Sequence, residues 1–283
     1  MRSIDFSVQI KNLKKERALA MDFAATMGVE NFIDLNKFQE HVLNTDTMKM
    51  LHSSGLGEKL YCGENIPVAG NALFDALVWS SIHQFCFWYN PYVQNERGKL
   101  TSGMVHDMCL RGHHDAIPNL SLTLRKERYH INQVLESFDY NFGLNIQMDA
   151  LLKLDIFNFD FFKKKKNLFF MQLIRYREEL TIHDSKLLEL DQVINPAIDY
   201  QIPKMLRDIG IITYPHDIGL MVDSGEIIQK DSYEELFIRS VTYFALVKIQ
   251  EVYGYSQNQL DWLFWSTRNN SCSKHHCTIT EDY

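Results

Sequence analysis

Apolar residues recur at helical spacing along much of the chain, and the alternation typical of strands is rare. This spacing predicts helices over residues 22–35, 38–51, 71–88, 168–180 and 232–252. Residues 142–159 alternate in places, which is compatible with one short strand. The pattern as a whole therefore predicts a mainly α protein.

The helix over residues 232–252 has the clearest signals at both ends. Ser232 and Glu235 have the spacing of a capping box, in which each side chain binds a backbone N–H at the helix start. Gly254 follows as a stop signal. The helix over 71–88 is apolar almost throughout and is followed by Asn90 and Pro91, so we expect it to be a buried helix.

No internal repeat or low-complexity linker divides the chain, so we expect a single helical domain over residues 1–266. Residues 267–283 are polar, and we expect them to form a frayed C-terminal tail. This tail contains metal-binding residue types at Cys272, His275, His276 and Cys277, but their spacing matches no zinc module. We therefore expect neither a metal site nor a cofactor.

Composition narrows the function classes. The 283 residues are 46% hydrophobic and 23% charged, as in ordinary globular proteins. The net charge of −7 argues against a nonspecific nucleic-acid binder, which carries a basic excess. The five cysteines are odd in number and irregularly spaced, which argues against a disulfide framework. With no N-terminal signal and no apolar run of membrane-spanning length, the expected location is the cytoplasm.

Four common motifs of enzyme active sites are missing from the sequence. It has no Walker loop, no dinucleotide-binding glycine motif, no Gly-x-Ser-x-Gly and no His-Glu-x-x-His. These absences argue against chemistry on nucleoside triphosphates or dinucleotides and against a zinc peptidase.

Two carboxylates are candidates for catalysis. Asp199 follows Asn195 and Pro196, a plausible helix start, where the helix dipole favours an ionised carboxylate. Such a group can stabilise a cationic sugar transition state or activate water, although it can equally serve as a cap or an ion-pair partner. Asp223 lies in a turn signature, Val222–Glu226, and an Asx turn is its structural alternative.

Charged residues elsewhere offer sites for a phosphate. Arg239 lies four residues after Glu235, so the two form either an intrahelical pair or part of a phosphate clamp. Lys164 and Lys165 belong to a run of four lysines that is either a solvated helix start or a phosphate site. Aromatic residues are dense near Phe87 and Trp88, where core packing competes with stacking on a flat base; nearby His83 is a core histidine or a site residue.

Several blocks of the sequence resemble, in order, those of the queuosine salvage proteins, which are N-glycosylases that release queuine from queuosine 5′-phosphate. The blocks are Phe85-Cys-Phe87-Trp88, Phe162 with Lys164, Lys165 and Asn167, Asp199-Tyr200-Gln-Ile-Pro203, Glu235-Leu-Phe-Ile-Arg239 and Asp261-Trp262-Leu-Phe-Trp265. They span roughly residues 70–265, most of the chain. Their shared order makes the resemblance more specific than any single block.

The resemblance implies an all-α domain similar in fold to the helix-hairpin-helix DNA glycosylases. It implies a hydrolase that cleaves the N-glycosidic bond of queuosine 5′-phosphate, with Asp199 as catalytic residue and Asp223 as the alternative. The implied substrate-binding residues are His83, Phe87, Trp88, Tyr200, Lys164, Lys165, Glu235, Arg239 and Trp262. The implied partner is a small nucleotide, with no stable nucleic-acid complex and no membrane. Two other functions stay open: a nucleic-acid base glycosylase and a non-catalytic nucleobase-binding protein.

Overall fold

The computed structural model describes residues 6–43, 70–83, 102–113, 164–180, 185–267 and 273–280, with residues 131, 133, 135, 152 and 182 singly. The helices are α1 (Ser7–Thr26), η1 (Val29–Phe32), α2 (Asn36–Phe38), η2 (Gln39–Leu43), α4 (Gly70–His83), α5 (Ser102–Leu110), α8 (Lys164–Arg175), α9 (Ser185–Val193), α10 (Gln201–Asp208), α11 (His216–Ser224), α12 (Tyr233–Tyr253) and α13 (Gln257–Thr267). Within these ranges β-structure is limited to two isolated bridges. The mainly α prediction is confirmed.

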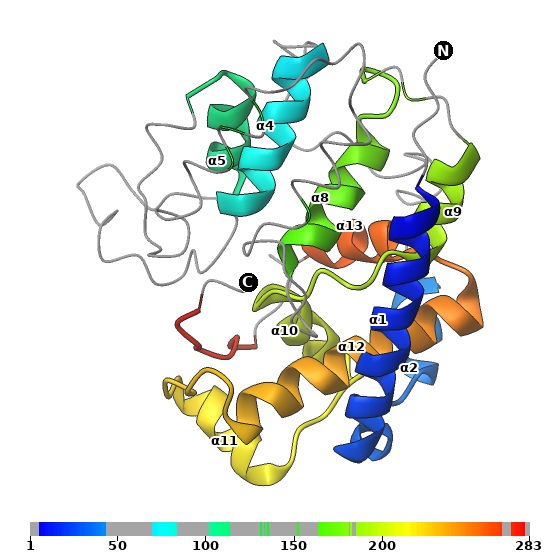
Figure 1. The fold of residues 1–283 in the computed structure, drawn as a ribbon. Helices are drawn as coiled ribbons and strands as arrows, with labels where there is room; N and C mark the ends of the chain where they lie inside the picture. The colour runs from blue at the N-terminus through cyan, green and yellow to red at the C-terminus, as the bar shows by residue number, and fades with distance from the viewer. Residues whose placement is uncertain are drawn as a thin grey trace, which may run out of the picture.

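The described residues form two apolar core clusters, and α1 contributes to both (Figure 1). The first part of α1 packs Ile10 and Leu13 among residues of α4, α5, α8 and α9. The second part packs Ala20 and Ala24 against residues of α10 to α13. Helix α1 therefore buries apolar surface against both clusters, and burial of apolar surface is the main driving force for folding.

Helix α12 is buried on most of its surface and crosses beneath α1 in Figure 1. The Ser232 side chain accepts a hydrogen bond from the Glu235 N–H at 3.3 Å, as the capping box predicts. The Glu235 carboxylate reaches back to the N–H of Asp231 at 3.2 Å, one residue before the predicted partner. Gly254 ends the helix with φ 78°, a left-handed conformation that glycine adopts without strain. The predicted helix over 232–252 is therefore confirmed.

Two other predicted helices differ from the structure in their bounds. The helix expected over 22–35 is wrong in its second half, because α1 ends at Thr26 and Gly28 turns the chain with φ 68°. Its start was also missed, since α1 begins at Ser7. The helix expected over 168–180 begins earlier, at Lys164, and ends at Arg175.

Parts of the remaining predictions fall outside the described residues. The helix expected over 71–88 is present as α4 up to His83, and residues 84–88 are not described. The helix expected over 38–51 is present only as α2 and the π-turn η2, and residues 44–51 are not described. Of residues 142–159, the structure describes Leu152 alone.

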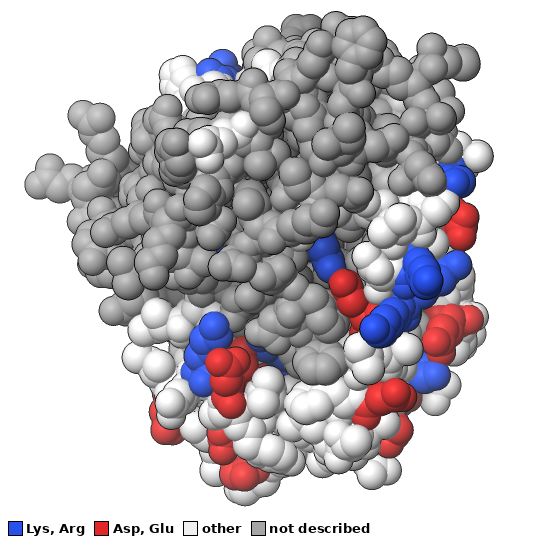
Figure 2. Space-filling model, in the orientation of Figure 1, with Lys and Arg blue, Asp and Glu red and all other residues white. Residues whose placement is uncertain are grey.

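The described surface is mixed in charge. On the described part of the face shown in Figure 2, basic and acidic residues lie interspersed. None of the described helices is both long and apolar enough to cross a lipid bilayer.

Candidate functional site

A buried segment without regular secondary structure, residues 194–198, leads to Asp199. Three helices hold its start. Arg17 of α1 donates to the Ile194 carbonyl and, at 3.2 Å, to the Asn195 side-chain oxygen. The Tyr243 hydroxyl of α12 donates to the same Asn195 oxygen at 2.9 Å. On the α8 side, the Asn167 amide lies 3.5 Å from the Pro196 carbonyl.

These hydrogen bonds fix the backbone that precedes Asp199, because leaving a buried polar group without a partner would lower the stability of the folded state. The helix start expected at Asn195 and Pro196 is wrong. The chain has no regular secondary structure there, and α10 begins only at Gln201.

Asp199 caps α10. Its Oδ1 accepts hydrogen bonds from the N–H groups of Gln201 at 2.7 Å and Ile202 at 2.9 Å. Pro203 fits in the first turn, where no intrahelical N–H bond is required. The two backbone donors hold this oxygen at the positive end of the helix dipole. The expectation of an Asp at a helix N-terminus is therefore confirmed, and the carboxylate is half-buried in a fixed orientation.

Asp223 has a different environment. Its two carboxylate oxygens accept from the Arg207 guanidinium at 2.7 and 2.8 Å, and its side chain is 56% exposed. This hydrogen bonding lowers the pKa of Asp223 below its usual value. The Asx turn expected here is wrong, because Asp223 lies in the last turn of α11 and Gly225 ends that helix.

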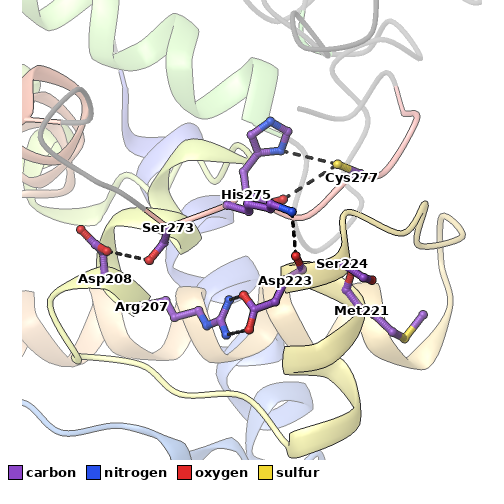
Figure 3. Close-up of polar contacts among 9 residues, drawn as sticks. Arg207, Asp208, Met221, Asp223, Ser224, Ser273, His275 and Cys277 are labelled. Atoms are coloured by element: carbon purple, nitrogen blue, oxygen red, sulfur yellow. Dashed lines mark hydrogen bonds and ion pairs between the residues drawn. The ribbon is translucent and has the colours of Figure 1, made fainter.

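Residues 273–280, which we name the C-terminal strap, pack onto α10, α11 and the loop after α11 (Figure 3). Ser273 donates to Asp208 at 2.6 Å, and the Lys274 ammonium donates to the Asp223 carbonyl at 2.8 Å. The Ile228 N–H donates to the Cys277 carbonyl at 2.8 Å beside a parallel bridge. The expectation of a frayed tail is therefore wrong for these residues. The polar side chains that suggested fraying form hydrogen bonds to α10 and α11 instead.

The two strap histidines face different parts of the body. The His275 ring lies against the Tyr200 ring, with centroids 4.9 Å apart. His276 is buried, and burial lowers its pKa to about 3, with smaller contributions from the positive charges of His275 and Arg239. His276 is therefore a neutral side chain near the Arg239 guanidinium at neutral pH.

Glu235 and Arg239 form an ion pair on α12 at 3.2 Å, and both side chains are almost fully buried. The intrahelical pair weighed from the sequence is therefore present. Contact of Arg239 with a phosphate stays a prediction. Because an unpaired buried charge is costly, each partner requires the other.

Other candidate residues lie apart from the strap. His83 binds the Trp79 carbonyl at 2.8 Å within α4, as expected of a core histidine. Lys165 is buried, which contradicts the solvated helix start weighed for the lysine run. Trp262 stacks on Trp265 with centroids 5.9 Å apart. Phe87, Trp88 and the side chain of Lys164 lie outside the described residues.

A cavity of about 160 Å³ lies at the far end of α10 from Asp199. It is lined mainly by apolar residues of η2, α10 and α13, among them Met205, Leu263 and Phe264. Pockets for ligands of drug size have volumes of about 300–1,000 Å³, so this cavity is too small for a nucleotide.

The strap thus joins candidates that are far apart in the sequence: it contacts Tyr200 and Asp223 and approaches Arg239. The sequence interpretation weighed His275 and His276 only as metal ligands and so missed the packing of His275 on Tyr200 and the burial of His276. In the described part of the chain, no three His, Cys, Asp or Glu side chains are arranged to hold a metal ion.

Residues 183–281, about a third of the chain, match the family model described as queuosine salvage protein. The resemblance to this family is confirmed. The matched region contains Asp199, Asp223, Glu235, Arg239 and the strap, and it supports a role in queuosine salvage. No curated protein matches the chain.

Proposed function

We propose that this protein hydrolyses the N-glycosidic bond of queuosine 5′-phosphate and releases queuine. The observation that carries the proposal is the fixed carboxylate of Asp199. It lies at the end of a buried, hydrogen-bonded segment, caps α10 through two backbone amides, and belongs to the region that matches the salvage family.

The chemistry requires a carboxylate of this kind. As the bond to the base breaks, positive charge builds on the sugar, and water must reach the anomeric carbon. An ionised carboxylate stabilises that charge and accepts a proton from the water. A preorganised group does this without reorganising at the moment of reaction.

Of the two candidate carboxylates, Asp199 fits the role better. Asp223 is more than half exposed and is held by the Arg207 guanidinium in a surface ion pair, which competes with any developing charge on a substrate. The proposed ligand is a small nucleotide, in line with the family match.

Asp199→Asn tests the proposal, because asparagine can cap α10 in the same way while removing the charge. The assay incubates each variant with queuosine 5′-phosphate and measures free queuine by mass. We expect turnover to fall by about 10²- to 10⁴-fold, the usual contribution of a positioned acid or base, with nucleotide binding nearly unchanged.

Asp34→Asn is the matched control. Asp34 is an exposed residue whose Oδ1 also accepts a backbone N–H, that of Asn36 at 3.0 Å, but it lies outside the matched region. This control should keep full turnover. Near-full turnover of Asp199→Asn together with an inactive Asp223→Asn would transfer the catalytic role to Asp223. Release of no base by the unmodified protein would refute the glycosidase.

A further inference from the structure

The strap contacts the residue that links Asp199 to the helix it caps. Tyr200 stands between Asp199 and Gln201, so its backbone connects the carboxylate to the first N–H that binds it. The backbone position of Tyr200 therefore helps to set the distance between Asp199 Oδ1 and its donors. The side chain of Tyr200 is 9% exposed and lies against the His275 ring.

Helix α10 depends on such contacts. It has eight residues, and helices of this length are marginal without tertiary packing. Apolar residues on one face, Ile202, Met205 and Leu206, bury it against the second core cluster. That packing reaches the first turn through Ile202, whereas the residues just before the helix are held by the Asp199 hydrogen bonds and by the His275 ring packed on Tyr200.

The His275 ring is itself oriented by the strap. Its Nδ1 lies 2.8 Å from the His276 carbonyl, and the Cys277 sulfur lies 4.0 Å from the same nitrogen (Figure 3). The flanking bonds of Lys274 to Asp223 and of Cys277 to Ile228 fix the strap backbone on either side. The ring thus contacts Tyr200 from a support anchored on α11 and on the loop that follows it.

We propose that His275 is a positioning residue for the site: its ring, packed on Tyr200, holds the first turn of α10 in the arrangement that fixes the Asp199 carboxylate. The catalytic part of this inference rests on the proposed function. The structural part does not, because the hydrogen bonds of Asp199 to Gln201 and Ile202 exist whatever the substrate.

The test compares His275→Ala, which removes the ring, with His275→Phe, which keeps an aromatic ring without the imidazole nitrogens. His216→Ala is the control, because His216 is an exposed histidine at the start of α11. Hydrogen exchange is measured at the Gln201 and Ile202 amides, and kcat and KM are measured with queuosine 5′-phosphate.

We expect His275→Ala to speed exchange at these two amides and to lower kcat by roughly 5- to 10-fold with KM little changed, because a displaced catalytic group slows the chemical step more than binding. His275→Phe should restore both quantities, and His216→Ala should alter neither. Melting curves of each variant test whether the body stays folded, which is expected because His275 is only partly buried.

Unchanged amide exchange in His275→Ala, or failure of His275→Phe to restore it, would overturn the inference whatever the activity. Faster exchange with unchanged kcat would overturn its catalytic part. If exchange responds as expected but the unmodified protein releases no queuine, the proposed function fails, and the contact between His275 and the Asp199 turn is upheld.

Discussion

Protonation of His276 should release the strap in acid. The structure lowers the pKa of this buried imidazole from 6.5 to about 3, mainly by burial and next by the positive charges of His275 and Arg239. A depressed pKa means that the folded state favours the neutral ring. The stabilisation is therefore fully present above pH 6.5 and is lost as the pH falls below that value, when the exposed ring of the undocked state binds a proton.

The free energy of unfolding should fall by about 1.4 kcal/mol for each pH unit below 6.5. Down to pH 5 we therefore expect a total loss of about 2 kcal/mol. Guanidinium unfolding followed by tryptophan fluorescence at pH 8, 7, 6 and 5 measures it. His276→Gln removes the titrating group, so the difference between the original protein and this variant should shrink by that amount on going to pH 5.

Taking the difference between the two proteins cancels the titration of the carboxylates, which both share. His216→Gln, at an exposed position on α11, serves as the control and should follow the original protein at every pH. If the original protein and His276→Gln lose stability in parallel across this range, the burial of a neutral His276 is the wrong explanation.

Three further predictions follow from buried polar contacts. Arg239→Met leaves the Glu235 carboxylate buried without its partner and should cost about 3–5 kcal/mol in urea unfolding; adding Glu235→Gln should recover part of this loss, and no recovery would contradict the pairing. Tyr243→Phe removes one hydrogen bond to Asn195 and should cost about 1 kcal/mol by the same measurement, against an Asn195→Ala variant as reference. Burial raises the pKa of Asp191, so its contribution to stability is lost as the pH rises through that raised value; Asp191→Asn should therefore raise the melting temperature at pH 8, with the gain vanishing below pH 4.

Local signals predicted those parts of the protein that local interactions determine. The helical period and the Ser232 capping box predicted α12 correctly, because the cap and its first turn lie within four residues of each other. Asp199 was placed at a helix N-terminus for the same reason, although the helix starts later than predicted.

The remaining parts depend on contacts between distant segments. The segment 194–198 is held by Arg17 and Tyr243, which are 177 and 48 residues away from their partners. The burial of His276 depends on a surface formed by other helices. A polar sequence such as Ser273–Thr280 carries no periodicity that could reveal such docking, so the strap was expected to fray.

One face of α12 carries the polar contacts that organise this half of the protein. Glu235 and Arg239 lie near the strap, Tyr243 binds the segment before Asp199, and Gln250 binds the end of α9 at 2.9 Å. At about 100° per residue, these four positions fall within roughly 80° of one another around the helix axis.

Inserting one residue between Arg239 and Tyr243 would turn everything after it by about 100°. The ion pair would then keep its place while the Tyr243 hydroxyl pointed away from Asn195. Because α12 is buried on most sides, the amount of apolar surface that it buries would hardly change. The contacts near the strap and the contact to the segment before Asp199, however, could no longer form at the same time. Natural variation in α12 should consequently consist of substitutions at constant length, and changes in length should be confined to the loops before Ser232 and after Gly254.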